Sequence, residues 1–116
     1  MKYFIVEKAA SLEEALLKVP YEIILNVIYT VKDGTRQDFY NEIVKEKIDQ
    51  LSRDEEGNIK YEYYFPVEDE NKILLIEVWK DAEAQKLHNK SEHFEKLQKI
   101  KEKYVINVQF ERFYLV

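Results

Sequence analysis

The sequence has no cysteine, only two glycines and two prolines, and no long apolar run. Without cysteine it cannot form disulfides, iron–sulfur clusters, thiolate zinc sites or a thiol nucleophile, which fits a reducing compartment. The longest apolar stretch near the start, residues 3–6, is too short for a signal peptide or a membrane span. We therefore expect a cytoplasmic protein that does not contact membranes and consists almost entirely of regular secondary structure.

A basic segment is also missing. The net charge is -5, and the 18 basic and 23 acidic residues are scattered along the chain. Nucleic-acid binding requires a basic patch that neutralises phosphates, so we expect no nucleic-acid partner. Aromatic residues are abundant instead, with nine Tyr, six Phe and one Trp in 116 residues. Such side chains build a hydrophobic core, and they also line the apolar cavities that bind small molecules.

Hydrophobic periodicity predicts four strands and two helical regions. The predicted strands are 21–31, 59–65, 73–79 and 106–116. A helix is expected from a cap at Thr35 to near Ser52, because apolar residues recur at three- and four-residue steps, including Leu51. Two shorter helices are expected after caps at Asp81 and Ser91. In the strand 59–65, Ile59 is expected on the same face as Tyr61.

This order of elements, β-α-β-β-α-β, predicts a ferredoxin-like α+β fold, an antiparallel sheet with both helical regions on one face. Strands 21–31 and 73–79 are apolar on both faces, so we expect them to be buried on both. The helices can cover only one face, and we expect a second copy of the chain to cover the other. Residues 21–116 are predicted to form this domain, and residues 1–20 are predicted to be an extension with a short strand within residues 2–8 and a helix over 11–17 that starts at a capping box.

Three spaced segments carry a recognisable pattern: Glu55 to Tyr61, Glu77 to Ala84, and His88 to Phe94. Together they resemble the antibiotic-biosynthesis monooxygenase (ABM) domain family, and the resemblance covers residues 21–116. It implies a dimeric α/β barrel with a pocket inside the fold. Relatives of this kind include cofactor-free oxygenases of polycyclic aromatics, quinol monooxygenases, an isomerase of a phosphorylated autoinducer and haem-degrading enzymes.

His88, Asn26 and Trp79 are the candidate catalytic residues. His88 lies on the helix face of Ala84 and Leu87, points at the sheet, and titrates where a base must work. Asn26 interrupts an apolar strand, and a buried amide must find partners or serve a ligand. Trp79 offers an indole donor and a stacking surface, and neighbouring strands could bring it to the same pocket as Asn26. His88 as support for its helix and Trp79 as core packing are the structural alternatives.

Substrate contacts are expected from Tyr61, Tyr63, His93 and Glu77. The two tyrosines could instead belong to the core or to a dimer interface. His93 follows the cap Ser91 closely and could simply line the start of the helix. Glu77 shares a face with Trp79, because alternate residues of a strand point to the same side. A structural role for Glu77 is the more usual one.

No cofactor and no metal are expected. Asn26 and Trp79 match two positions of the haem-degrading relatives, but the third falls near Gln98, which cannot ligate iron as an imidazole does. His88 and His93 are five residues apart, which would place them on different sides of a continuous helix. These observations argue against both haem and a histidine metal site.

The resulting hypothesis is a cofactor-independent monooxygenase of a quinol or other electron-rich small aromatic. Such chemistry needs a base to form the substrate anion, donors to stabilise that anion, and an apolar cavity that excludes water. An isomerase or degrader of a small carbonyl metabolite that works through an enediol needs nearly the same groups. A dimeric small-molecule-binding protein without turnover is the third hypothesis.

Overall fold

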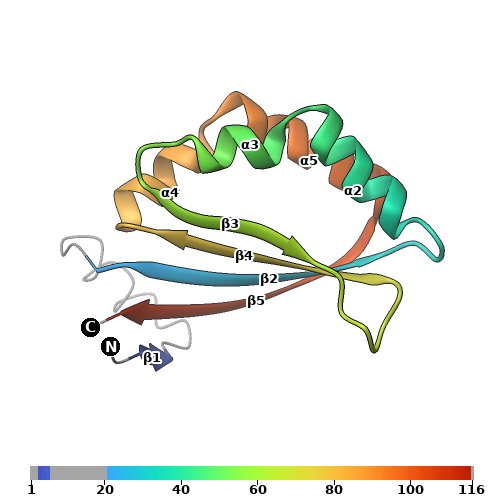
Figure 1. The fold of residues 1–116 in the computed structure, drawn as a ribbon, viewed down its shortest axis with the longest axis horizontal. Helices are drawn as coiled ribbons and strands as arrows, with labels where there is room; N and C mark the ends of the chain where they lie inside the picture. The colour runs from blue at the N-terminus through green and yellow to red at the C-terminus, as the bar shows by residue number, and fades with distance from the viewer. Residues whose placement is uncertain (1–2, 6–20, 116) are drawn as a thin grey trace.

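The computed structural model describes residues 3–5 and 21–115, which form an antiparallel sheet with helices on one face (Figure 1). The strands are β1 (Tyr3–Ile5), β2 (Ile23–Val31), β3 (Asn58–Tyr64), β4 (Lys72–Trp79) and β5 (Val105–Leu115). They lie in the order β1-β5-β2-β4-β3, and every neighbouring pair is antiparallel. Helices follow β2 and β4 in the chain, so the predicted ferredoxin-like fold is confirmed.

The N-terminal strand β1 extends this sheet at one edge. Tyr3 lies opposite Leu115, and Ile5 lies opposite Phe113. The short strand expected in the extension is therefore present. The helix expected over 11–17 lies outside the described residues.

The helices are α2 (Arg36–Lys45), α3 (Ile48–Arg53), α4 (Ala82–Asn89) and α5 (Glu92–Tyr104), and all lie on the same side of the sheet (Figure 1). The caps predicted for α4 and α5 are confirmed. Asp81 Oδ1 accepts from the Ala84 amide at 2.8 Å, and Ser91 Oγ accepts from the Phe94 amide at 3.2 Å. Thr35 precedes α2, but its hydroxyl donates to the Lys32 carbonyl instead of capping the helix.

The prediction of one continuous helix over 35–52 is wrong. The chain breaks between α2 and α3 at Lys47, whose φ of 57° is left-handed. The break changes the phase of the helical pattern, so that Ile43 and Ile48, five residues apart, are both fully buried. It also leaves Leu51 exposed, although its spacing had placed it on the inner side.

The two central strands alternate between two environments. On β2 every second residue from Ile23, and on β4 every second residue from Ile73, is buried beneath the helices. We call this the inner face. The intervening residues form the open face and are only partly buried, so the expected burial of both faces is not met within one protomer. The apolar members of the open face are Ile24, Ile28, Leu74, Ile76 and Val78.

Strand β3 departs from simple alternation at its start. The pairing with β4 shifts between Asn58 and Lys60, which is a β-bulge. As a result Ile59 is 55% exposed while Tyr61 is completely buried. The expectation that Ile59 shares the buried face with Tyr61 is wrong because the bulge rotates the strand between them.

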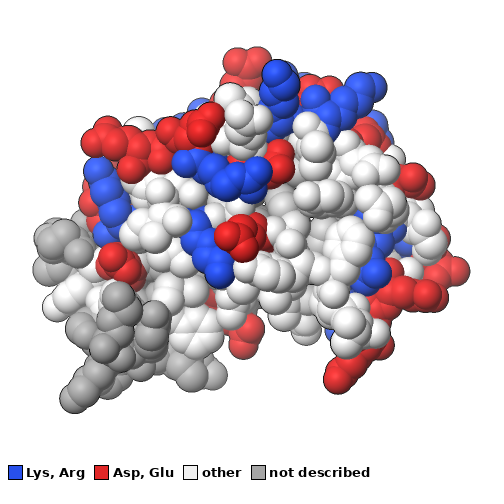
Figure 2. Space-filling view, viewed as in Figure 1, with Lys and Arg blue, Asp and Glu red and all other residues white. Residues whose placement is uncertain are grey.

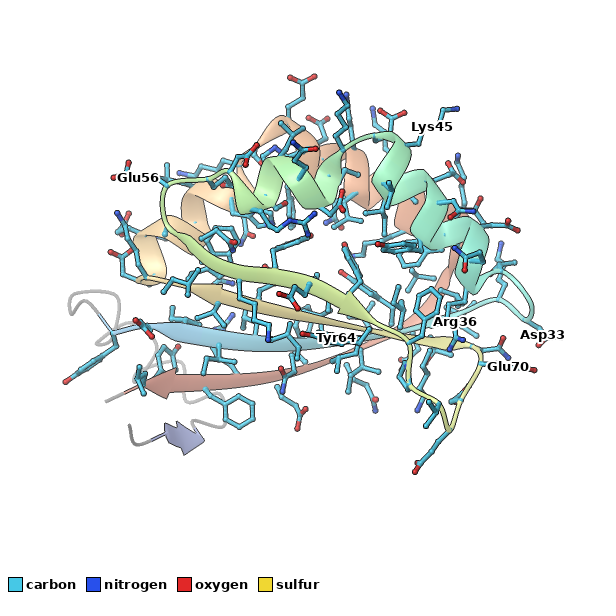
Figure 3. All side chains as sticks on the ribbon, viewed as in Figure 1. Asp33, Arg36, Lys45, Glu56, Tyr64 and Glu70 are labelled. Atoms are coloured by element: carbon cyan, nitrogen blue, oxygen red, sulfur yellow. The ribbon has the colours of Figure 1, made fainter. Side chains whose placement is uncertain are left out.

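Side chains from the helices and from the inner face project into the layer between them (Figure 3). Arg36 closes one end of this layer. Its Nη1 donates to the carbonyls of Asp69 at 3.0 Å and Lys72 at 3.2 Å, and its guanidinium lies 4.2 Å from the centre of the Phe65 ring. Arg36 thus fixes the β3–β4 hairpin to the start of α2.

Acidic and basic side chains intermingle over the helices on the face shown in Figure 2. A helix that crosses a membrane must be both long and apolar. Among the described residues, none of the helices combines the length and the apolar character that crossing a bilayer requires.

Candidate functional site

His88 is held inside the fold by the placement of α4. The cap Asp81 starts the helix directly after β4, and His88 follows Ala84 by one helical turn, so both face the sheet. Only 2% of His88 is exposed, whereas Leu87 is 67% exposed. The expectation that His88 points at the sheet is confirmed, but Leu87 does not share its face.

Gly57 allows this close approach. It lies in the turn between α3 and β3, and a Cβ at this position would overlap the Cβ of Ala84 on α4. Its carbonyl also accepts from the Lys80 amide at 2.9 Å. The absence of a side chain at Gly57 therefore brings the turn that carries Glu55 against the helix that carries His88.

Glu55 binds His88 directly. The Oε2 atom of Glu55 lies 2.6 Å from His88 Nδ1. A carboxylate accepts hydrogen bonds, so Nδ1 carries the hydrogen and Nε2 of the neutral imidazole is left with its lone pair. Burial lowers the pKa of His88, and the hydrogen bond and negative charge of Glu55 oppose this effect. A neutral His88 with Nε2 unprotonated is the form that can accept a proton.

His93 contacts the same carboxylate oxygen. Its Nε2 lies 2.9 Å from Glu55 Oε2, and its ring centre is 5.6 Å from that of His88. The two histidines converge because the helix is interrupted: α4 ends at Asn89, and α5 begins after the cap Ser91. The argument that their spacing places them on different sides of one helix is wrong for this reason.

Glu55, His88 and His93 are also the side chains that could hold a metal ion. Their ligand atoms lie within 4.8 Å of one another, and in the described part of the chain they are the group with this property. Hydrogen bonds of 2.6 and 2.9 Å to one shared oxygen already account for their arrangement. The spacing argument against a histidine metal site therefore fails, and the absence of a metal stays a prediction.

Glu77 and Trp79 complete the site from β4. The indole Nε1 of Trp79 donates to Glu77 Oε1 at 3.0 Å, and the same oxygen lies 4.0 Å from His88 Nε2. The rings of Trp79 and His88 lie 4.6 Å apart at an angle of 36°. Burial raises the pKa of Glu77 to about 7, although the bond from Trp79 works in the opposite direction. Glu77 therefore exchanges a proton near neutral pH, next to His88, whose pKa is lowered by burial.

Tyrosines line the neighbouring part of the inner face. Tyr61 on β3 lies opposite Glu77, and its ring centre is 5.7 Å from that of His88. The hydroxyls of Tyr61 and Tyr63 lie 3.3 Å apart. Burial raises the pKa of both, and of Tyr29 on β2. These hydroxyls are therefore protonated at neutral pH and can donate hydrogen bonds.

Asn26 does not join this cluster. It lies opposite Ile76 on β4 and Glu111 on β5, whereas Trp79 lies opposite Ile23. Asn26 and Ile23 are an odd number of residues apart, so their side chains point to opposite faces of the sheet. Within one protomer the expectation that Asn26 and Trp79 border one pocket is wrong. The sequence does not show this, because both alternating sets of β2 are apolar.

Glu55 is the functional candidate that the sequence did not reveal. It stands within the segment that carries the family resemblance, but nothing in its surroundings distinguishes it from the many other surface acids. Only the interruption between α4 and α5, together with the contact at Gly57, brings both histidines to it. Gln98 accepts a hydrogen bond from Lys101 Nζ at 3.1 Å.

The sequence matches the family model for antibiotic biosynthesis monooxygenase over residues 23–100, which is most of the described domain. The chain belongs to the antibiotic biosynthesis monooxygenase family. The ABM match includes Glu55, Glu77, Trp79, His88 and His93. The whole cluster thus lies in the part of the chain that defines the family.

Individual relatives agree with this assignment. The "Putative monooxygenase YcnE" of Bacillus subtilis is 38% identical over 73 residues, covering 63% of this chain and 75% of that protein. A conserved Bacteroides thetaiotaomicron protein described as a "Possible Oxidoreductase" has a TM-score of 0.74 at 27% identity, over 84% of this chain and 100% of that one. A "Putative antibiotic biosynthesis monooxygenase" of Nitrosomonas europaea has a TM-score of 0.74 at 16% identity, covering 82% of this chain and 90% of that one, which shows the ABM fold.

Proposed function

We propose that this protein is a cofactor-independent monooxygenase that acts on a quinol or another electron-rich phenolic small molecule. The observation that carries the proposal is the state of His88. It is a buried imidazole whose Nδ1–H is held by Glu55 and whose Nε2 is directed toward the interior, close to Trp79 and Glu77. Membership of the ABM family and a relative named as a monooxygenase support the same conclusion.

The proposed reaction begins with proton transfer from a substrate hydroxyl to His88 Nε2. The resulting anion is rich in electrons and can reduce oxygen itself. For a quinol, one oxygen atom enters the ring and the other leaves as water, so that quinol and O₂ give a hydroxyquinone and water. The substrate supplies all four electrons, and no outside reductant is required.

The surrounding residues suit this chemistry. Trp79 offers a flat ring beside His88 against which an aromatic substrate can stack. The protonated hydroxyls of Tyr61 and Tyr63 are donors for an anionic oxygen. Asn26 has no part in this proposal, because it lies on the open face. His93 binds the same oxygen of Glu55 as His88 does and so helps to hold this carboxylate in place.

Enediol isomerisation is the second candidate, and the separation of 4.0 Å between His88 Nε2 and Glu77 Oε1 favours it. An isomerase must remove a proton from one carbon and return it to the next. A neutral histidine beside a carboxyl group that exchanges its proton near neutral pH can serve as base and acid in turn. Isomerisation would consume no oxygen, which separates the two candidates in one assay.

Oxygen consumption across a series of quinols tests the proposal. The protein is first treated with a chelator so that adventitious metal does not oxidise the substrate. We expect uptake of one O₂ per quinol without release of peroxide. Rapid loss of substrate without oxygen uptake would favour isomerisation, and binding without any turnover would favour a carrier protein.

We also infer that the protein forms a homodimer through its open face. The apolar residues Ile24, Leu74, Ile76 and Val78 lie there on adjacent strands without helices above them. An Ile76→Asp substitution places one charge from each copy in the paired surface. Light scattering should show a dimer for the wild type and a monomer for this variant, whereas a monomeric wild type would contradict the inference.

A further inference from the structure

Lys101 reaches the buried layer from α5. It follows the buried Ile100 and lies one turn after the buried Leu97, so its side chain starts on the inner side of the helix. Its Nζ lies 5.3 Å from the centre of the Tyr29 ring on the inner face of β2. The ammonium group is therefore placed between the helix and the sheet, and Lys101 is partly buried.

This cation lacks an ion-pair partner in the described part of the chain. Its Nζ donates to the neutral amide oxygen of Gln98 at 3.1 Å, and no described carboxylate lies within ion-pair distance. Other lysines of α5 do have such partners: Lys103 binds Glu42 at 2.7 Å, and Lys96 lies 3.7 Å from Glu46. A partly buried charge without an ion-pair partner is costly, and charged groups with perturbed pKa values cluster at functional sites.

Lys101 and His88 both interact with the buried carboxyl group of Glu77. The positive charge of Lys101 acts on Glu77 and lowers its pKa, and Glu77 in turn lies beside His88 Nε2. Burial lowers the pKa of Lys101, while Glu77 opposes this change. Along the sheet, Tyr29 lies opposite Ile73, four residues before Glu77 on β4, which is a distance of roughly 13 Å. This is the spacing of backbone positions, and the side chains of His88 and Lys101 extend from their helices into the layer between them, so a phenolic ring with an acidic substituent and a hydrogen bond at each end can connect the two groups.

We propose that Lys101 binds a carboxylate of the substrate, so that the protein selects phenolic compounds that carry an acidic substituent. In this arrangement the reacting ring lies against Trp79 and His88, and the acidic substituent lies over Tyr29 at Lys101. Gln98 keeps the ammonium group in place through its amide oxygen. This inference rests on the proposed function for the reactive end of the substrate, but the carboxylate contact itself requires no turnover.

Binding without oxygen tests the inference separately from the reaction. The probes are 2,5-dihydroxybenzoate and hydroquinone, which share the ring and its hydroxyls and differ in the carboxylate. Trp79 is the single tryptophan, so quenching of its fluorescence reports a ligand beside it. We expect the wild type to bind the acid at least about tenfold more tightly, the scale of one charge-assisted hydrogen bond.

Three variants make the test specific to Lys101. Lys101→Met should lose the preference for the acid, and Lys101→Arg, which keeps the charge, should retain it. Lys99→Met removes the same charge from the exposed side of α5 and should retain the preference as well. Equal binding of the two probes by the wild type, no binding of either, or a preference that survives in Lys101→Met would overturn the inference. Preference without oxygen uptake would overturn only the proposed monooxygenation.

Discussion

The two faces of the sheet depart from the usual distribution of polarity, although the inner face is mainly apolar. An antiparallel sheet covered on one side normally buries apolar side chains under its helices and exposes polar ones. Here the covered inner face carries Glu77 and meets His88, whereas the open face carries a group of aliphatic residues. Burial in this chain therefore serves chemistry on one face and, in our account, association on the other. Glu77 and His88 are buried away from water, which raises the pKa of Glu77 and lowers the pKa of His88.

The largest effect should follow from removing the base on the inner face. His88→Ala should lower turnover per folded molecule by roughly a hundredfold or more, which is typical of a lost general base. Leu87→Ala, the exposed neighbour on α4, is the matched control and should be near wild type. Thermal unfolding of the same preparations shows whether the fold is intact. If His88→Ala lowers only the melting temperature, His88 braces the helix and is not the base.

The buried carboxyl of Glu77 should make stability depend on pH. Its pKa is about 7 in the folded chain against 4.5 ordinarily, so the folded state holds this proton more strongly than the unfolded state. The stabilising contribution is complete below about pH 4.5 and is lost as the pH rises through 7, a change of about 3 kcal/mol. Denaturant unfolding of wild type and Glu77→Gln from pH 4.5 to 8 should therefore diverge. Glu102→Gln, at an exposed site, should parallel the wild type; parallel curves for Glu77→Gln would refute the assignment.

The stability of the fold should be sensitive to a methyl group added at the close contact between Gly57 and Ala84. Gly57→Ala should lower the free energy of unfolding by about 2 kcal/mol, because the new Cβ overlaps Ala84. Ala84→Gly removes the other side of the overlap, so the double variant should recover part of this loss. A double-mutant cycle in denaturant measures the coupling. Additive effects would mean that the turn and α4 are not in contact.

The smallest effect on turnover is expected on the open face. Asn26→Ala should leave turnover per folded molecule at the wild-type level and change the free energy of unfolding by about 0.5 kcal/mol. The reason is that the sheet backbone separates Asn26 from His88 and Trp79. Kinetics measured at concentrations where the wild type and the variant have the same oligomeric state test this. A large loss of turnover would show that the two faces communicate.

Local sequence patterns were sufficient to predict most of the fold. Strands β2 and β4 were predictable because β-branched residues are dense there, and α4 and α5 because Asp81 and Ser91 are good caps. The break at Lys47 was not predictable, since nothing marks this residue as left-handed. There the packing of the buried isoleucines on both sides overrides a regular helical pattern.

The site was predictable only in part. His88, Trp79 and Glu77 follow from helix and strand periodicity, because each lies on a regular element whose inner side can be read from the sequence. Glu55 and Lys101 do not, because a turn and a partly buried helix position next to the core carry no clear periodic signal. The face on which Asn26 lies was not predictable either. Both alternating sets of residues in its strand are apolar, so the sequence does not show which set faces the helices.

Labelled oxygen tests the central claim most directly. The wild type is supplied with a quinol under ¹⁸O₂, and the product is analysed by mass spectrometry beside the His88→Ala variant. We expect one labelled oxygen atom in a hydroxylated quinone, formed by the wild type and strongly reduced in the variant. An unlabelled quinone, or label incorporated equally by both proteins, would contradict the account of His88 as the base of a cofactor-independent monooxygenase.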